Sequence, residues 1–386
     1  MMITPPTKSS ILPPPILVTD ANQLQLCIQT LFDSEAIAVD TEFMRTDTFF
    51  PILGLVQIFN GNNCWLIDPL SIPDLTPLKN LLTNNDVLKV FHSCSEDIEV
   101  LKHVLGCIPQ PIFDTQVAAA FVGYGFSKGY ATLVNIILDV HVDKGETRSN
   151  WLQRPLSDSQ LGYAALDVVY LLPVYIELKK ELLILERHKW VDEEMTSLVE
   201  MASVTEDLSL YFQKIKGAWQ LSPEKLSALQ LICEWREIEA RKKNRPRGRI
   251  IDDKTILGVA SKAPQSRKEL SEIEGMYSAL VQRYAEKFLD FINESLDRSS
   301  EDHPGALVEP LPRYANSMIK NLKKIIIAQA DSLNLAPELL AKKKDVEFLV
   351  RCIINKEQIK LPNKIAYGWR LEAIGSLLLE SSADLV

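Results

Sequence analysis

The sequence predicts an α/β domain with a mixed sheet, followed by all-α helical domains. Strand-like apolar runs, first consecutive and then alternating with helical patterns, fill the chain up to about residue 200. From about residue 205 onward almost no strand pattern appears, and apolar residues recur at helical spacing. The length of 386 residues agrees with two to three domains.

The first domain opens with a helical pattern over residues 20–35, for which Thr19 or Asp20 is available as the N-cap. Strands are predicted over 37–43, 53–59, 64–68, 88–91 and 112–113. Asn60-Gly61 between two apolar runs is a strong hairpin signal. Helices are predicted over 95–105, from Asp114 onward, and over 158–183 with a kink or break at Pro173.

Residues 221–296 are predicted to form four or five short helices, opening with Ser222 as a cap and Pro223 at the first helical position. A polar linker over 299–305 separates them from a second helical set over 311–380, which ends in an amphipathic helix from Gly368. We therefore expect domains over 1–205, 215–297 and 306–386.

The net charge of −9 argues mildly against a protein that only coats nucleic acid, because such binding rests on a cationic surface. No apolar run approaches the ~18 residues that span a bilayer, and the N-terminus does not resemble a secretory signal. We expect a cytoplasmic protein without membrane contact or an obligate protein partner. The six cysteines form no C-x-x-C pair and are expected to be buried free thiols.

Acidic residues stand at the ends of three predicted elements. Asp40 and Glu42 are two apart in a strand and share one face, Asp97 lies in the first turn of a helix, and Tyr163 and Asp167 are four apart on one helical face. Two adjacent carboxylates repel each other, and a hard divalent cation such as Mg²⁺ or Mn²⁺ relieves that repulsion.

Each of these motifs has an ordinary structural interpretation when taken alone. Asp40 and Glu42 are also compatible with surface acids, Asp97 with a helix-dipole partner, and Tyr163 with the edge of a core. Among the other acids, Asp114 is expected to be a helix cap and Asp68 part of a turn. We do not expect His92 to be a metal ligand.

Taken together and in this order, the motifs resemble the tyrosine-containing branch of the DEDD exonuclease superfamily. The strings VDTEFMRTDTFFPILGLVQI, FHSCSEDIEVL, FDTQVAAAFVGYG, DKGETRSNWLQRPLSDSQLGYAALDVVYLLPVY and YGWR are similar to the ribonuclease D family over nearly the whole chain. The resemblance implies a ribonuclease H-like catalytic domain followed by two helical modules of the helicase-and-RNase-D C-terminal (HRDC) type, of which the second matches less well.

The resemblance also implies the chemistry. Asp40, Glu42, Asp97 and Asp167 would bind two Mg²⁺ or Mn²⁺ ions, Tyr163 would orient the attacking water, and nucleoside 5′-monophosphates would leave the 3′ end of RNA. Substrates would be RNAs with a free 3′ end, with transfer RNA precursors implied. Glu42 is also a candidate contact for the terminal ribose.

Two basic segments are candidates for RNA binding. Arg148 lies in a loop similar to a family segment. This loop could line the substrate path with Arg148 near phosphate, or it could equally brace the helix that carries Tyr163. Residues 236–249 hold seven basic residues against two acids, and Arg245, Arg247 and Arg249 are the candidates there.

Two other functions use the same residues. A 3′–5′ DNA exonuclease would need the same carboxylates, and a non-catalytic RNA-binding scaffold would keep the helical modules without needing the acids. The presence of all five motif positions makes the scaffold the weakest of the three hypotheses.

Overall fold

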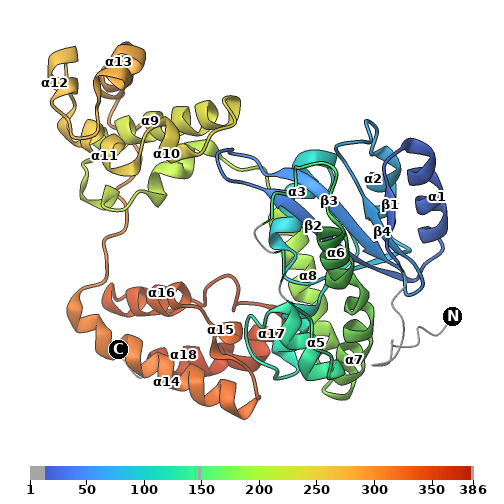
Figure 1. Cartoon of the computed structure of the whole chain (residues 1–386). Helices are drawn as coiled ribbons and strands as arrows, with labels where there is room; N and C mark the ends of the chain where they lie inside the picture. Colours follow the sequence, from blue (N-terminus) through green and yellow to red (C-terminus); the bar gives the residue numbers. More distant parts are fainter. Residues whose placement is uncertain (1–13, 144, 147–148, 384–386) are drawn as a thin grey trace. The chain divides into compact units, whose positions relative to one another are not determined.

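The computed structural model of the chain describes residues 14–143, 145–146 and 149–383 (Figure 1). A six-stranded mixed sheet, in the order β1-β4-β3-β2-β5-β6, organises the N-terminal part. The strands are β1 (Ile16–Val18), β2 (Ala36–Met44), β3 (Ile52–Phe59), β4 (Cys64–Ile67), β5 (Leu88–Phe91) and β6 (Ile112–Asp114). β2 is antiparallel to β3 and parallel to β5, so it lies in the middle of the sheet.

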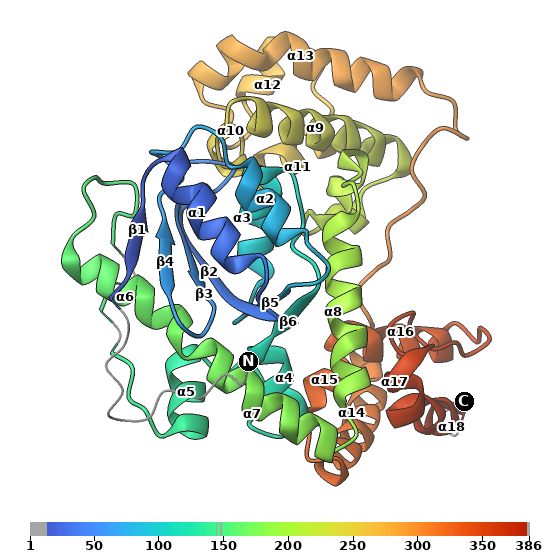
Figure 2. The same cartoon turned by 90° about the vertical axis from the view of Figure 1, so that its right-hand side faces the viewer.

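Helices surround this sheet and continue beyond it (Figure 2). They are α1 (Ala21–Leu31), α2 (Thr76–Leu82), α3 (Ser95–Leu105), α4 (Thr115–Phe121), α5 (Tyr130–Leu138), α6 (Asp158–Val169), α7 (Leu171–Ile184) and α8 (His188–Ser203). α6 packs on β2, β3 and β4, whereas α3 contacts β2 and β3.

The predicted α/β class and the helical C-terminal part are confirmed, and so are the five predicted strands to within two residues at each end. β1 was not predicted, because three residues are too few for a periodic pattern. The break in the long helix falls at Tyr170 rather than at Pro173. Pro173 instead lies in the first turn of α7, where a missing N–H leaves no helical hydrogen bond unmade.

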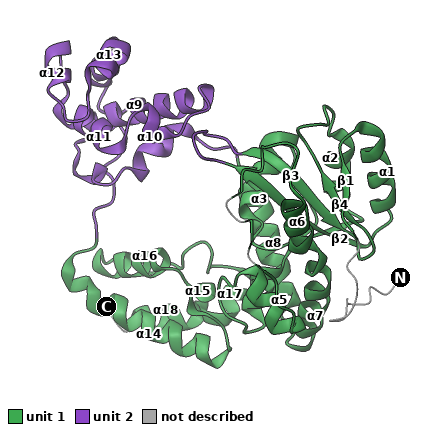
Figure 3. Ribbon diagram, in the orientation of Figure 1, with its two compact units in different colours: residues 1–44, 52–204, 311–386 green, residues 45–51, 205–310 purple. Residues whose placement is uncertain are grey.

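The chain divides into two compact units (Figure 3). Unit 1 contains the described residues up to Met44, residues 52–204 and residues from Leu311 onward, and unit 2 contains residues 45–51 and 205–310. The last helical set therefore groups with the sheet. The expected domain limits of 1–205, 215–297 and 306–386 stay a prediction.

The C-terminal helices of unit 1 begin after a single turn of 3₁₀ helix, Arg313–Ala315. They are α14 (Asn316–Ser332), α15 (Pro337–Leu340), α16 (Lys343–Ile354), α17 (Gly368–Arg370) and α18 (Ser376–Ala383), with a π turn at Leu371–Gly375 between the last two. The predicted amphipathic helix from Gly368 is thus present, interrupted by that turn.

The YGWR segment attaches these helices to α8. The Trp369 ring stacks on Trp190 at 5.0 Å, and its backbone N–H donates to the Glu193 carboxylate at 3.0 Å. Arg370 forms an ion pair with Glu194, which also accepts from the Trp369 indole N–H. The polar groups of Trp369 and Arg370 named here are thus bonded to carboxylates of α8, and these charge-assisted bonds fix the segment against that helix.

Unit 2 consists of helices, their connections and the non-helical residues 45–51 and 298–310. Its elements are 3₁₀ turns at Leu208–Lys214 and Ala218–Gln220 and helices α9 (Pro223–Lys242), α10 (Arg247–Ile250), α11 (Asp253–Lys262), α12 (Arg267–Ser271) and α13 (Ser278–Asp297). Five α-helices agree with the predicted number, but α9 and α13 have 20 residues each and are not short. Ser222 occupies the N-cap position of α9 without accepting a hydrogen bond from the helix backbone, and its hydroxyl instead donates to Glu224.

Residues 45–51, which connect β2 to β3, belong to unit 2 by their contacts. The Phe49 ring lies under the guanidinium groups of Arg241 and Arg247, at 4.6 and 4.8 Å. The backbone N–H groups of Phe49 and Phe50 both donate to Asn244 Oδ1. The strand that carries the predicted catalytic acids therefore runs directly into a segment held by α9 and its C-terminal turn.

All six cysteines are buried and free, as predicted. Residues 158–184 are long and apolar enough to cross a membrane by length and composition alone. More than half of their most apolar window is buried inside the protein, which is typical of a core helix.

Gly54 in β3 tests how tightly the sheet is packed beside Tyr163. A Cβ at Gly54 would lie 2.7 Å from the Trp151 carbonyl oxygen, whereas a Cβ at Gly162 in α6 would meet nothing within 4 Å. We expect Gly54→Ala to lower the free energy of unfolding by about 1–3 kcal/mol through overpacking. We expect the control Gly162→Ala to be neutral or to stabilise by up to about 1 kcal/mol. Thermal unfolding followed by circular dichroism measures both, and equal melting temperatures for the two variants would contradict the packing described here.

Candidate active site

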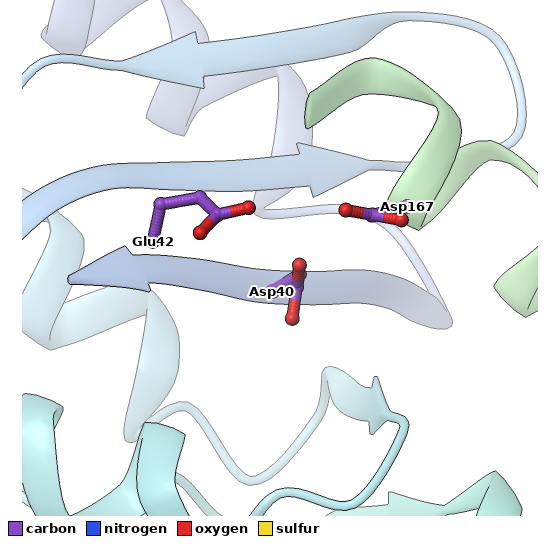
Figure 4. A group of neighbouring side chains, drawn as sticks. All are labelled: Asp40, Glu42 and Asp167. Atoms are coloured by element: carbon purple, nitrogen blue, oxygen red, sulfur yellow. The ribbon is translucent and has the colours of Figure 1, made fainter. Parts of the chain in front are cut away.

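Three carboxylates converge beside the central strand. Asp40 and Glu42 are two residues apart on β2 and face the same side, and Asp167 reaches toward them from α6 (Figure 4). Each of the three offers an oxygen atom within 4.8 Å of the other two. Residues 127 positions apart in the sequence (167 − 40) are thereby brought into contact distance.

Asp97 lies beside Thr41 of β2. It lies in the first turn of α3, is 6% exposed, and accepts a hydrogen bond from the Thr41 hydroxyl. Thr41 alternates with Asp40 and Glu42 along the strand, so its side chain points away from them and toward α3. Asp97 does not belong to the group of three, although its charge still raises the pKa values of Asp40 and Glu42.

Tyr163 stands one helical turn before Asp167 and donates its hydroxyl hydrogen bond to that carboxylate. The Trp151 ring lies 6.2 Å from the Tyr163 ring and is buried, so it limits where the phenol can move. Burial and the nearby carboxylates raise the pKa of Tyr163, so the phenol keeps its proton at neutral pH. The phenol is therefore a hydrogen-bond donor and not a base.

The four acids share an unfavourable electrostatic environment. Burial, followed by the negative charges of Asp97, Asp167 and Glu42, raises the pKa of Asp40 well above its usual range. Burial and two neighbouring carboxylates raise the pKa of Glu42 to about 8. Burial also raises the pKa values of Asp97 and Asp167 to about 7, although the hydrogen bonds from Thr41 and Tyr163 oppose these shifts.

This donor set fits a hard divalent cation. Carboxylate oxygens are the ligands that Mg²⁺ and Mn²⁺ prefer, and a cation would relieve the repulsion that raises these pKa values. Gln57 on β3 pairs across the strand from Asp40 and is fully buried. Neither of its amide atoms has a hydrogen-bond partner within the described part of the chain, which is costly unless a ligand or its water supplies one.

Gln57 and Tyr130 are candidate site residues that the sequence analysis missed. The signal for Gln57 is a single polar residue within the apolar run of β3. The Tyr130 hydroxyl donates to the Leu166 carbonyl at 2.7 Å, directly before Asp167, and its ring is partly buried against the core. No sequence pattern connects Tyr130 with Asp167, because the contact depends on how α5 meets α6.

The competing residues take structural roles, as predicted. Asp114 caps α4 and also accepts from the Ser93 and Cys94 N–H groups. Asp68 forms a turn with Leu70 and an ion pair with Arg154. The His92 ring is hydrogen bonded to Thr115 and to the Lys128 carbonyl, so neither ring nitrogen is directed at the carboxylates.

The basic candidates differ in their surroundings. Arg148 lies outside the described residues. Arg247 is paired with the buried Glu237 carboxylate and also covers Tyr211. Arg249 is exposed and 3.7 Å from the exposed Asp47, and Arg245 is exposed, with no ion pair recorded in the described part of unit 2. Arg245 and Arg249 are thus better placed than Arg247 to contact RNA.

Comparison with known proteins agrees with this geometry. A 3′–5′ exonuclease family model matches residues 15–183, and an HRDC domain model matches residues 225–292. The chain is 40% identical to ribonuclease D of Pseudomonas paraeruginosa over 345 residues, covering 89% of this chain and 91% of the relative. It is 35% identical to ribonuclease D of Haemophilus influenzae, covering 95% and 92%.

A solved structure is similar over nearly the whole chain. The crystal structure of Escherichia coli RNase D, described as an exoribonuclease involved in structured RNA processing, matches with a TM-score of 0.88 and 31% identity. The match covers 96% of this chain and 98% of that one. The predicted succession of a catalytic domain and an HRDC domain is therefore confirmed.

The raised carboxyl pKa values make metal-free stability depend on pH. Between about pH 4.5 and 8 the folded protein retains protons that the unfolded chain has released, so stability falls as pH rises through this window. A divalent cation binds the deprotonated carboxylates, so we expect Mg²⁺ or Mn²⁺ to raise the melting temperature by several degrees at pH 8 and much less at pH 5. A free metal concentration of 100 times Kd would raise the free energy of unfolding by about 2.7 kcal/mol.

Differential scanning calorimetry with and without chelator measures this effect, and Glu42→Gln is the matched variant. Removing one charge should raise the stability of the metal-free protein at pH 8 and reduce the gain from metal. An equal gain from metal at pH 5 and pH 8 would show that the cation binds elsewhere.

Proposed function

This chain belongs to the ribonuclease D family and is a 3′–5′ exoribonuclease, and from that premise we propose how its site works and which RNA it processes. The substrates are precursors of transfer RNA, shortened from the 3′ end to nucleoside 5′-monophosphates with two divalent ions. The observation that supports this proposal is the convergence of Asp40, Glu42 and Asp167 within 4.8 Å, with Asp97 behind them.

The family implies dependence on divalent metal, and Asp40, Glu42, Asp97 and Asp167 are the residues that would hold it. Divalent ions in such a site supply an activated water and neutralise charge on the leaving oxygen. Tyr163, protonated and fixed by Asp167 and Trp151, orients the water by a hydrogen bond. Glu42 is partly exposed and is our candidate for a contact with the terminal ribose, where a 2′-hydroxyl distinguishes RNA from DNA.

Further assignments follow the expectations from the sequence. We propose that the enzyme acts in the cytoplasm, and that residues 306–386 are a second HRDC-like module beside the one matched at 225–292. Expression of 215–297 alone tests the domain limits, because a self-contained module should unfold cooperatively.

The rival DNA exonuclease shares the carboxylate set, and the matched exonuclease family model does not itself name RNA. The closely similar relatives are ribonucleases, which favours RNA. Digestion of matched RNA and DNA oligonucleotides separates the two, since comparable rates on both would remove the proposed role of the 2′-hydroxyl.

Asp40→Asn tests the reaction itself. The substitution removes a metal-binding charge but keeps the shape of the side chain, so we expect mononucleotide release to fall by about 10³-fold or more, or several kcal/mol of transition-state stabilisation. RNA labelled at the 5′ or the 3′ end shows which end is attacked. Asp47→Asn, an exposed acid on the β2–β3 connection, is the matched control and should retain activity. Full activity in Asp40→Asn would refute the proposed site.

Arg245 and Arg249 are expected to bind RNA phosphates, whereas Arg247 is expected to support the helical unit. Arg245→Ala with Arg249→Ala should weaken RNA binding and lower the slope of log affinity against log salt by about 1.4, at ~0.7 per phosphate contact. Arg247→Ala should instead lower the stability of unit 2, because it leaves Glu237 and Phe49 short of a partner. Fluorescence anisotropy at several salt concentrations and thermal unfolding distinguish these outcomes, and an unchanged salt slope would exclude both arginines from the interface.

A further inference from the structure

A groove in unit 1, separate from the carboxylates, combines exposed apolar side chains with lysines. It lies among α14, α15, α16 and the loop between α4 and α5, and has a volume of about 450 Å³. Its lining is Phe126, Lys323, Ile326, Ile327, Pro337, Glu338, Ala341, Lys342, Lys343 and Val346. This volume is within the range of sites that enclose small ligands.

The apolar floor of the groove is open to solvent. Phe126 is 46% exposed and Ile327 is 48% exposed, although both are large apolar side chains. Phe126 is the only aromatic side chain in the lining and comes from the loop, opposite the helices that supply the lysines. A solvent-exposed phenyl ring in a groove offers a surface on which a nucleobase can stack.

The rim of the groove is cationic. Lys323, Lys342 and Lys343 face one acid of the lining, Glu338. Lys343 is 3.3 Å from the exposed Glu347 carboxylate, and no ion pair is recorded for Lys323 or Lys342 among the residues that the structure describes. Two or three lysines beside an aromatic ring form the combination that binds single-stranded nucleic acid without reading its sequence.

The loop that carries Phe126 is anchored at both of its ends. The Lys128 carbonyl accepts hydrogen bonds from His92 at 3.1 Å and from Gln116 at 3.0 Å. Tyr130, two residues further on, is bonded to the carbonyl that precedes Asp167. At the other end, Gly123 packs against Asn334 at the end of α14 with no room for a Cβ. The loop therefore joins the groove to the back of the active site.

We propose that this groove binds single-stranded RNA upstream of the scissile bond, with one base stacked on Phe126 and phosphates paired with Lys323 and Lys342. The inference rests on the exoribonuclease activity, which brings a polyanionic single strand to this unit. The groove is cationic and belongs to the same compact unit as the carboxylates. An RNA strand therefore fits it better than an uncharged, apolar partner would. The groove adds affinity for long RNAs and leaves the chemistry at the 3′ end unchanged.

Hydrolysis of an RNA length series, from a dinucleotide to a twenty-mer, tests the proposal. A dinucleotide has one phosphodiester and engages the carboxylate site alone. We expect Phe126→Ala to lower kcat/KM by about tenfold for the twenty-mer and by less than twofold for the dinucleotide. The length at which the defect first appears gives the position of the groove along the strand. Phe348→Ala, another exposed phenylalanine of these helices that lies outside the groove, should have no effect.

Charge is tested with two double variants, each of which removes one positive charge from the middle of α14 and one from the start of α16. Lys323→Ala with Lys342→Ala should lower the salt slope for twenty-mer binding by about 1.4. Lys324→Ala with Lys344→Ala, neighbours that do not line the groove, should lower it by less. Photocrosslinking of a twenty-mer that carries 4-thiouridine should label the peptide that contains Phe126.

Equal losses for all lengths, or an unchanged twenty-mer rate in Phe126→Ala, would overturn the proposal. A change in sedimentation of the Phe126 variant with unchanged RNA affinity would also overturn it and would assign the groove to a second copy of the chain. Failure of the exoribonuclease assignment is a separate result, because the wild type would then release no mononucleotide from any length.

Discussion

Repulsion among buried carboxylates is the constraint on which the rest of unit 1 depends. Asp40, Glu42 and Asp167 lie within 4.8 Å of one another, and the charges of Asp167 and Asp97 raise the pKa values of Asp40 and Glu42. A protein keeps such a cluster only if the surrounding structure holds the side chains in place. Here β2 is held between two strands, and α6 is packed on three.

Neutral donors around the cluster support this arrangement. Thr41 donates to Asp97, Tyr163 donates to Asp167, and Tyr130 holds the carbonyl before Asp167. These bonds restrict the acids without neutralising their charges. Once deprotonated, the cluster carries a negative charge that a divalent cation would balance. Gln57, beside Asp40, has two buried amide atoms without a hydrogen-bond partner among the described residues.

Much of this was visible in the sequence, for identifiable reasons. The order Asp-x-Glu, a later Asp and Tyr-x-x-x-Asp is linear information, and the apolar runs before Asp40 and Asp97 placed both acids at the edges of elements. The sequence did not show which basic side chains remain unpaired and free to contact RNA. Of the seven basic residues between 236 and 249, Arg236, Arg241 and Arg247 are paired with Asp253 or Glu237. The pair of Arg241 with Glu237 follows from i, i+4 spacing on α9, whereas the pairs of Arg236 and Arg247 depend on how α9 packs against the residues that follow it. Gln57 and Tyr130 were missed for a similar reason, because each depends on a contact between distant segments.

The separation between Asp40 and Asp167 also has a consequence for the synthesis of the protein. Chain elongation delivers Asp40 and Glu42 first and the α6 acid much later, so a ribosome-bound fragment that stops before α6 lacks one of the three converging carboxylates. Since a metal site forms only when its ligands are folded together, such a fragment has no complete centre for hydrolysis.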